Sequence, residues 1–221
     1  LGSEIYFDGS LTISSLSNIW LLTLLAGIAV WAQLAQLQML LRLYREGSRD
    51  PLTGLVNRRV LNKWLSLEMS RAREQERPLS ILLFDLDFFK RVNDTYGHLT
   101  GDKVLQTFSR LLKRDLAHFN LIGRYGGEEF IAVLTDKDES AAMKIAEGIR
   151  ENCHTVQTRG SEGCLVNFTV SIGVTGLRDT DTTETLIHRV DKGLYSAKMK
   201  GRDTVALAEE DAVTPPVSIK N

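Results

Sequence analysis

The pattern of apolar and polar residues first separates a long uncharged segment from an amphipathic remainder. No charged residue occurs between Gly9 and Leu41. Within this segment, residues 16–37 supply the roughly 20 apolar positions that a membrane-spanning helix needs, with Gln33 and Gln36 as polar interruptions. We therefore predict a transmembrane helix over residues 16–37. A buried helix of a soluble sensor is the alternative.

Charged residues on either side of this helix predict its orientation. Glu4 and Asp8 precede it. Arg42, Arg45 and Arg49 follow it. Because positively charged loops stay on the cytoplasmic side, we expect an inner (cytoplasmic) membrane protein whose C-terminal portion lies in the cytoplasm. No basic region precedes the apolar run and no A-x-A-like cleavage site follows it, which argues against a signal peptide.

A short heptad-like stripe overlaps the end of this segment. Four residues repeat at spacings of three, four and three: Leu34, Leu37, Leu41 and Tyr44. The stripe is shorter than two heptads, so it is weak support for a coiled coil. We expect a helical stalk or linker over residues 38–49. Residues 1–15 are expected to end an upstream extracytoplasmic segment, since the chain begins with leucine rather than methionine.

The remaining chain alternates between segments of helical and of strand periodicity. The predicted helices are Asn57–Glu76, Asp102–Leu116, Glu139–Asn152 and Thr183–Lys200, with a short turn-and-helix segment between Lys90 and Tyr96. The predicted strands are Leu79–Leu86, Leu121–Tyr125, Phe130–Leu134, Val166–Thr175 and Val205–Ala208. In the first helix the inward-facing residues are predicted to be Val60, Leu61, Trp64, Leu67 and Met69. This order is typical of an α+β domain, over residues 50–208. Residues 209–221 are expected to form a disordered tail.

Composition narrows the class of protein. A chain of 221 residues holds one domain of ordinary size in addition to the N-terminal helix. The net charge is −1, which gives no global electrostatic reason to expect a nucleic-acid partner. Cys153 and Cys164 show neither metal-site nor redox-motif spacing, so we expect reduced thiols in a cytoplasmic domain.

The strand predicted over residues 79–86 ends in acidic residues at a spacing of two. Side chains alternate across a strand, so Asp85 and Asp87 are expected on one face and Leu86 on the other. If this strand pairs with the hairpin that follows, Asp85 meets a glutamate of that hairpin at one end of the sheet. The alternatives are that Asp85 contacts a helix N-terminus and that Asp87 is a structural hydrogen-bond acceptor.

The hairpin carries two glycines followed by two carboxylates. Gly126 and Gly127 separate two apolar runs, which predicts a tight turn with positive φ. Glu128 and Glu129 follow, and two adjacent anions repel by roughly 3 kcal/mol at an effective dielectric constant of about 20. In extended geometry they point to opposite sides unless the turn relaxes this alternation. Oxygen ligands of this kind suit Mg²⁺ or Mn²⁺ together with phosphate. A solvated turn with two exposed acids is the alternative.

Several motifs in this order and spacing resemble the GGDEF diguanylate cyclases. The longest is Asp85-x-Asp-x-Phe-Lys90-x-x-Asn93-Asp-x-x-Gly-His98-x-x-Gly-Asp102, which is followed by Gly126-Gly-Glu-Glu-Phe130. The stretch Asp50-Pro-Leu-Thr-Gly-Leu-Val-Asn-Arg-Arg59 is similar to the usual opening of these domains, and Ala197-Lys-x-x-Gly-Arg202 to their closing segment. The resemblance covers about residues 48–207. It implies a ferredoxin-like, nucleotidyl-cyclase (palm-like) core, with an antiparallel sheet flanked by helices.

This resemblance implies that two GTP are condensed into cyclic di-GMP, with release of two pyrophosphates, by a homodimer in which each protomer holds one GTP. A 3′-hydroxyl attacks an α-phosphate with the assistance of Mg²⁺ or Mn²⁺. The implied metal ligands are the carboxylates of Asp85 and Glu128 and the backbone carbonyl of Leu86. Glu128 is also the candidate base, Glu129 is required in the motif, and Lys90 reaches the developing charge on the triphosphate.

Further residues are implied to bind the substrate. Asn93 and Asp102 offer an amide and a carboxylate that together read the edge of guanine; for Asp102 a helix N-cap is the alternative. His98 resembles the family's substrate-side histidine, with a structural role as the alternative. Lys198 and Arg202 are implied phosphate contacts, and complementing a helix dipole is their alternative role.

Two pairs of uncharged residues complete the implied site. Phe88 and Phe89 are expected to be packing residues whose amides face phosphate. Gly126 and Gly127 let the backbone approach the nucleotide.

The family's product-inhibition site, an Arg-x-x-Asp just before the signature, corresponds here to the stretch from Ala117 to Asn120. Neither charged end is present, so feedback binding of cyclic di-GMP at that position is not expected.

Three other functions fit parts of the sequence. A catalytically silent GTP-binding signalling module is expected to have a degenerate signature, whereas Gly126–Phe130, Asp85 and Lys90 are intact. A cyclase with mixed purine products is disfavoured by Asp102. A metal-binding structural domain would bind metal without nucleotide. Diguanylate cyclase activity is therefore the predicted function.

Overall fold

The computed structural model describes residues 9–118, 121–160 and 163–208, and within the first helix it describes the side chains of residues 18–40. The chain divides into two units, Leu1–Gly47 and Ser48–Asn221. The expectations for residues 1–8 and for the tail 209–221 lie outside the described residues.

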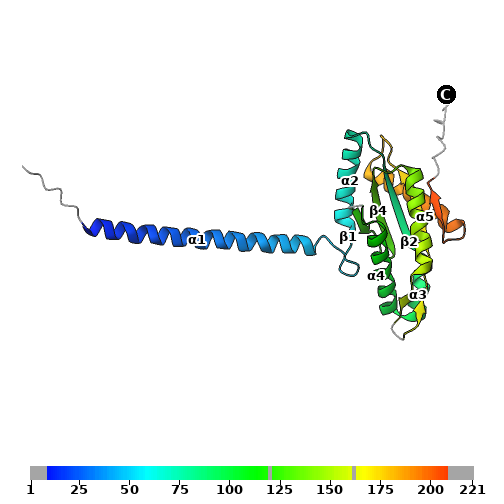
Figure 1. The fold of residues 1–221 in the computed structure, drawn as a ribbon, viewed down its shortest axis with the longest axis horizontal. Helices are drawn as coiled ribbons and strands as arrows, with labels where there is room; N and C mark the ends of the chain where they lie inside the picture. Colours follow the sequence, from blue (N-terminus) through cyan, green and yellow to red (C-terminus); the bar gives the residue numbers. More distant parts are fainter. Residues whose placement is uncertain (1–8, 119–120, 161–162, 209–221) are drawn as a thin grey trace, which may run out of the picture. The chain divides into compact units, whose positions relative to one another are not determined.

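The first unit contains one described helix, α1 (Gly9–Glu46), drawn in blue in Figure 1. It runs without interruption through the predicted transmembrane span and most of the predicted stalk. Within it, Asn18–Leu40 covers 23 residues with a mean hydropathy of 1.6, and its side chains are exposed. By length and composition this helix is able to cross a membrane. The core helix of a soluble protein and a signal sequence can have the same length and composition.

The second unit is built on a six-stranded mixed sheet in the order β1-β3-β4-β2-β7-β8. Figure 1 labels β1, β4 and β2. The strands are β1 (Val56–Asn57), β2 (Leu79–Leu86), β3 (Leu121–Arg124), β4 (Glu129–Thr135), β7 (Val170–Gly176) and β8 (Val205–Leu207). The pairs β3–β4, β4–β2 and β2–β7 are antiparallel, whereas the outer pairs β1–β3 and β7–β8 are parallel. The α+β class and the antiparallel core predicted from the sequence are confirmed.

Helices cover both faces of this sheet. The helices are α2 (Arg58–Glu74), α3 (Phe89–Tyr96), α4 (His98–Asp115), α5 (Glu139–Thr155) and α6 (Thr183–Met199). The side chains of β2 alternate between two cores: Leu82 and Phe84 pack with α4 and α5, whereas Ile81 and Leu83 pack with α2 and α6. All eight residues of β2 are buried. A strand covered on both faces reads as a continuous apolar run rather than an alternating one, as β2 does.

Side-chain caps set where three of these helices begin. The side chains of Asn57, Asp138 and Thr182 each accept a hydrogen bond from a backbone N–H of the following first turn, at 3.1, 2.8 and 3.2 Å. Such caps satisfy donors that have no partner inside the helix. Helix α4 begins at His98 rather than at the predicted Asp102, because Gly97 with φ +79° turns the chain directly from α3 into α4.

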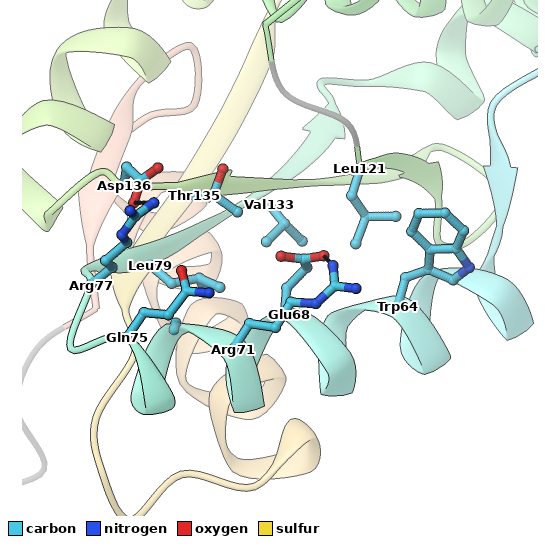
Figure 2. Close-up of a pocket in the computed structure, with 11 residues that line it drawn as sticks. Trp64, Glu68, Arg71, Gln75, Arg77, Leu79, Leu121, Val133, Thr135 and Asp136 are labelled. Carbon is cyan, nitrogen blue, oxygen red and sulfur yellow. Dashed lines mark hydrogen bonds and ion pairs between the residues drawn. The ribbon is translucent and has the colours of Figure 1, made fainter.

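Two other predictions about elements are wrong. The strand predicted over Val166–Thr175 is two strands, because Leu165–Val166 (β6) pairs with Thr158–Arg159 (β5) in a separate sheet. In α2, Trp64 and Leu67 are 44% and 50% exposed, and Leu65 is buried instead. The buried stripe of α2 follows Val60, Leu61, Leu65, Met69 and Ala72. Trp64 flanks that stripe at the edge of a cleft between α2 and the sheet (Figure 2).

Cys153 and Cys164 are free thiols in the structure.

Replacing Leu65 with alanine is expected to lower the free energy of unfolding by about 2–5 kcal/mol, because its fully buried side chain leaves a cavity. The matched control is Leu67→Ala on the same helix, which is expected to change stability by about 0.5 kcal/mol or less. Urea unfolding of the chain in a mild detergent, followed by near-UV circular dichroism, measures both. Similar losses in the two variants would contradict this placement of α2.

Candidate functional site

Carboxylates gather at one end of the central strands. Asp85 lies near the end of β2, and the antiparallel register places Glu129 of β4 directly opposite it. Glu128 precedes Glu129 in the loop, and its carbonyl accepts a hydrogen bond from the Leu86 N–H at 3.3 Å. Lys198 of α6 contacts this group, with its Nζ 2.8 Å from Asp85 Oδ2.

The electrostatics of the group reflect its crowding. Burial raises the pKa of Asp85, although Lys198 opposes the rise. Burial, and then the negative charge of Asp85, raise the pKa values of Glu128 and Glu129. The charge of Lys198 opposes the rise at both glutamates. These carboxylates carry more negative charge than one ammonium group balances.

The turn that carries the glutamates differs from the predicted one. Neither Gly126 nor Gly127 has a positive φ. The loop spans residues 125–128 and closes through the Tyr125 and Gly126 N–H groups, which both donate to the Glu129 carbonyl, at 2.8 and 3.2 Å. A Cβ at Gly126 would lie 2.4 Å from Glu129 Oε2, whereas a Cβ at Gly127 would meet no atom within 4 Å. A side chain at position 126 would therefore displace the carboxylate end of Glu129.

A second group of predicted residues lies where α3 meets α4. Asp102 is in the second turn of α4 and the N-cap position is Gly97, so the alternative role of Asp102 as a helix N-cap is wrong. His98, exposed at the start of α4, lies one turn before Asp102 and therefore on the same face of the helix. The Asn93 amide reaches the same place, because a Cβ at Gly101 would lie 1.9 Å from its Oδ1.

The two adjacent residues Phe88 and Phe89 differ in burial. Phe89 is buried in the core, whereas Phe88 is 59% exposed and has a left-handed backbone with φ 54°, so its prediction as a packing residue is wrong. The Arg202 guanidinium lies over the Phe88 ring, 4.7 Å from its centroid. Arg202 is also close enough to Asp85 for its charge to act on that carboxyl group. Lys90 is exposed in the first turn of α3.

One residue of the site was not predicted. Arg124, at the end of β3, donates from Nη1 to both carboxylate oxygens of Asp50, at 3.1 Å each. It also donates from Nη2 and Nε to the Gly127 carbonyl, at 2.7 and 3.2 Å. Asp50 in turn accepts from the Thr53 N–H and hydroxyl, at 2.8 and 2.7 Å. The carboxylate-bearing loop is thus fastened to the opening motif of the domain.

Two clefts flank α2, and only one of them reaches the carboxylates. A cleft of about 220 Å³ lies between α2 and strands β3 and β4. Figure 2 shows its arginines directed at acids: Arg71 contacts Glu68 at 2.6 Å, and Arg77 contacts Asp136 at 3.5 Å. No predicted site residue lines it. The other cleft, of about 390 Å³, is lined by Glu129 among residues of α2 and α6.

The carboxylates at the strand ends are candidate ligands for a divalent cation. Within residues 9–118, 121–160 and 163–208, no three Asp, Glu, His or Cys side chains form a ready-made metal site. Mg²⁺ and Mn²⁺, however, are held through one or two carboxylates and complete their coordination with water and phosphate oxygens. Asp85 and Glu128 supply that donor set. Burial raises the pKa of both carboxyl groups, and the charge of Asp85 adds to the rise at Glu128; a bound cation would offset both effects. The residues present fit a cation that binds together with a phosphate.

Comparison with known sequences gives consistent matches. The family profile described as "Diguanylate cyclase, GGDEF domain" matches residues 48–204. The response regulator PleD of Caulobacter vibrioides (strain NA1000 / CB15N) is 42% identical over 158 residues, which are 71% of this chain and 35% of that protein. Diguanylate cyclase DosC of Escherichia coli (strain K12) is 37% identical over 179 residues, which are 78% of this chain and 39% of that protein. The chain thus spans well under half the length of these curated relatives.

Solved structures show the same fold. The coiled coil and GGDEF domain of DgcB from Caulobacter crescentus, in complex with c-di-GMP, matches with a TM-score of 0.79 at 27% identity, over 85% of this chain and 99% of that one. The active GGEEF domain of a diguanylate cyclase from Vibrio cholerae matches with a TM-score of 0.66 at 32% identity, over 71% and 99%.

Replacing Asp50 with asparagine is expected to destabilise the domain at pH 7 by about 1–3 kcal/mol, because charge-assisted hydrogen bonds contribute about this much. Burial alone would raise the pKa of Asp50, but the hydrogen bonds from Thr53 and the charge of Arg124 lower it below its ordinary value of 3.8. A lowered carboxyl pKa gives stability that is present above the ordinary value and is lost as the pH falls through the folded value. The difference between the variants should therefore vanish in strong acid.

Urea unfolding at pH 7 and in strong acid measures this difference. The control is Asp136→Asn, which removes one charge from the exposed ion pair with Arg77 and is expected to cost about 0.5 kcal/mol or less at either pH. A loss for Asp50→Asn that is the same at both pH values would rule out the charge as its cause.

Proposed function

The chain belongs to the GGDEF diguanylate cyclase family, and from this premise we propose that it condenses two GTP into cyclic di-GMP and releases two pyrophosphates. The observation that carries the proposal is the group of carboxylates at the strand ends, Asp85, Glu128 and Glu129. Lys198 contacts Asp85, and its charge acts on both glutamates. A nucleotidyl transfer needs carboxylates to hold a divalent cation and cationic side chains to hold phosphate. Both kinds of group meet at this end of the sheet.

In this proposal Asp85, Glu128 and the backbone carbonyl of Leu86 would hold Mg²⁺ or Mn²⁺. When bound, such a cation lowers the pKa of the attacking hydroxyl group and neutralises developing phosphate charge. Glu128 is the candidate base for the 3′-hydroxyl proton, because it occupies the position of the first acid in the family's signature. Glu129, opposite Asp85 in the sheet, adds negative charge to the same site.

Basic residues on three segments would hold the triphosphate. Lys198 now contacts Asp85, and it would exchange this carboxylate for phosphate oxygens when the nucleotide binds. Arg202 lies beside Phe88 next to the strand end, and Lys90 is free to reach outward from α3. The backbone around Gly126 and Gly127 presents no side chain to a nucleotide.

The turn between α3 and α4 would select guanine. The Asp102 carboxylate accepts hydrogen bonds from the N1–H and 2-amino groups of guanine, and adenine lacks both donors in that arrangement. Asn93 lies against Gly101, the residue before Asp102. Its amide would therefore be available to the same edge of the guanine base. His98 lies one helical turn before Asp102 and would contact the substrate from the same face of α4.

Two further features of the proposal concern assembly. Because each protomer has one guanine site and one carboxylate group, two protomers must face each other for two GTP to react. Helix α1 would anchor the chain in the membrane through Asn18–Leu40, with the catalytic domain in the cytoplasm. Product feedback at the family's usual position is not part of the proposal: Ala117 is exposed just after α4 and Asn120 lies outside the described residues.

Purified protein incubated with GTP and Mg²⁺ is expected to form cyclic di-GMP, detected by chromatography, and ATP in place of GTP is expected to give no cyclic product. Glu128→Gln should lower turnover at least about 100-fold, as expected for the loss of a general base. Glu68→Gln in the cleft of Figure 2 makes the same chemical change outside the site and should leave turnover unchanged. Specific activity should fall on dilution if two protomers are required.

Equal turnover of the two glutamine variants would refute the assigned site. GTP consumption without cyclic di-GMP would refute the assigned reaction.

The membrane proposal is tested by flotation. Cells that express the chain are broken and their membranes are floated through a sucrose gradient; the chain is expected to float and to resist carbonate extraction. Replacing Leu24, Leu25 and Ile28 with lysine should release it, because lysine near the middle of a spanning helix costs about 2.5–3.5 kcal/mol or more. A wild-type chain that stays in the soluble fraction would contradict the anchor.

A further inference from the structure

Three residues with strained backbones meet at the phosphate end of the proposed site. Phe88, Arg202 and Asp203 have φ values of 54°, 65° and 45°, in the left-handed region that residues with a Cβ rarely adopt. Gly201, with φ 110°, precedes the second strained pair. Such conformations persist only where the surrounding structure enforces them, and they concentrate at functional sites.

One buried carboxylate fastens both strained segments. Asp87 is 5% exposed at the end of β2. Its Oδ2 accepts from the backbone N–H of Asp203 at 2.9 Å and from the Thr169 hydroxyl at 2.8 Å, while its Oδ1 accepts from the Ser171 hydroxyl at 2.6 Å. Asp87 directly precedes Phe88, and Asp203 directly follows the arginine that stacks on Phe88. The carboxylate of Asp87 therefore ties the backbones of the two stacked residues together.

Helix α5 holds the same turn from the other side. Arg150 donates from Nη1 to Asp203 Oδ1 at 3.1 Å, and His154 Nε2 lies 2.9 Å from Asp203 Oδ2. Arg150 is itself held by Glu147, to which its Nε and Nη2 donate. Asp203 is thus bonded through its backbone to β2 and through its side chain to α5. Its conformation leaves the neighbouring Arg202 little freedom.

We propose that Asp203 is a positioning residue for the reaction: bonded to Asp87 and Arg150, it fixes the left-handed turn that keeps the Arg202 guanidinium over Phe88 at the triphosphate end of the site. The inference rests on the proposed function, and it adds a residue that does not itself touch the substrate. Without the Asp203 contacts the turn relaxes, and Arg202 has to be ordered by the nucleotide at the moment of binding. Nucleotide affinity therefore falls although every contacting side chain is still present.

The test measures binding of a non-hydrolysable GTP analogue with Mg²⁺ by calorimetry. Asp203→Ala should weaken binding about tenfold, the order of one charged phosphate contact. Asp203→Asn should stay within about threefold, because asparagine tolerates the left-handed conformation and still accepts a hydrogen bond from Arg150. Asp179→Ala, at an exposed loop residue, is the control and should bind like the wild type.

A double-mutant cycle separates positioning from a general structural role. In an Arg202→Ala background, Asp203→Ala should cause no further loss of affinity, because the residue acts through Arg202. Equal losses with and without Arg202 would overturn the inference. If Asp203→Ala does not fold by circular dichroism, Arg150→Gln replaces it in the cycle. It leaves Asp203 in place and should show a smaller loss that also disappears in the Arg202→Ala background.

The same measurements distinguish this inference from the proposed function. Binding of the analogue without formation of cyclic di-GMP from GTP would refute the proposed function, while the cycle would still decide the role of Asp203. A wild-type chain that does not bind the analogue would overturn both.

Discussion

The burial of β2 on both faces is the constraint on which the rest of the domain depends. Its six apolar residues pack alternately into two cores, so a charged side chain along most of its length would carry a large desolvation cost. Polar chemistry is confined to the point where the strand leaves the core. Antiparallel neighbours on both sides then place Glu129 and Ser171 opposite Asp85. The position of the site follows from the packing of the sheet.

Elements outside the sheet complete that end of it. Helix α6 lies close to β7 at Gly173 and shares a core with α2, and its last turn brings Lys198 to Asp85. Arg124 joins Asp50 to the Gly127 carbonyl, so the opening segment of the domain and the loop before Glu128 share one guanidinium group. Its planar fork contacts two partners in different directions, an arrangement that the single ammonium group of a lysine would not reproduce. The loop is therefore held at a fixed distance from the start of the domain.

The sequence predicts features that depend on local pattern better than features that depend on tertiary partners. The bounds of β2 and the acidic residues at its end follow from one apolar run, and the α+β class follows from the order of the elements. The exposure of Trp64 was missed because a helical period admits two neighbouring stripes, and packing against the sheet decides which of them is buried. The φ values at Gly126 and Gly127 were missed because a Gly-Gly pair fits a longer loop as well as a two-residue turn.

The local sequence pattern did not predict contacts between residues that are distant along the chain. Arg124 and Asp50 are 74 positions apart, and both lie in motifs that the sequence singles out, yet nothing local indicates that they meet. The same holds for the pairing of Asp87 with the backbone of Asp203, 116 positions away. This pairing gives a reason for an aspartate at position 87. The sequence offered a structural hydrogen-bond acceptor as one role for that carboxylate, and its three hydrogen bonds to protein groups agree with this role.

The energies involved show why a carboxylate is buried at that position. Left-handed backbone at Phe88, Arg202 and Asp203 costs about 1–2 kcal/mol per residue, or about 3–6 kcal/mol in all. Hydrogen bonds to a charged group contribute about 1.5–3 kcal/mol each, and Asp87 accepts three, of which one comes directly from the strained segment. The three bonds together contribute about 4.5–9 kcal/mol, but only the bond from the Asp203 N–H, at about 1.5–3 kcal/mol, acts directly on the strained turn. An apolar residue at position 87 would leave the Asp203 N–H unpaired. The strained turn would then be held only by the contacts of the Asp203 side chain with α5.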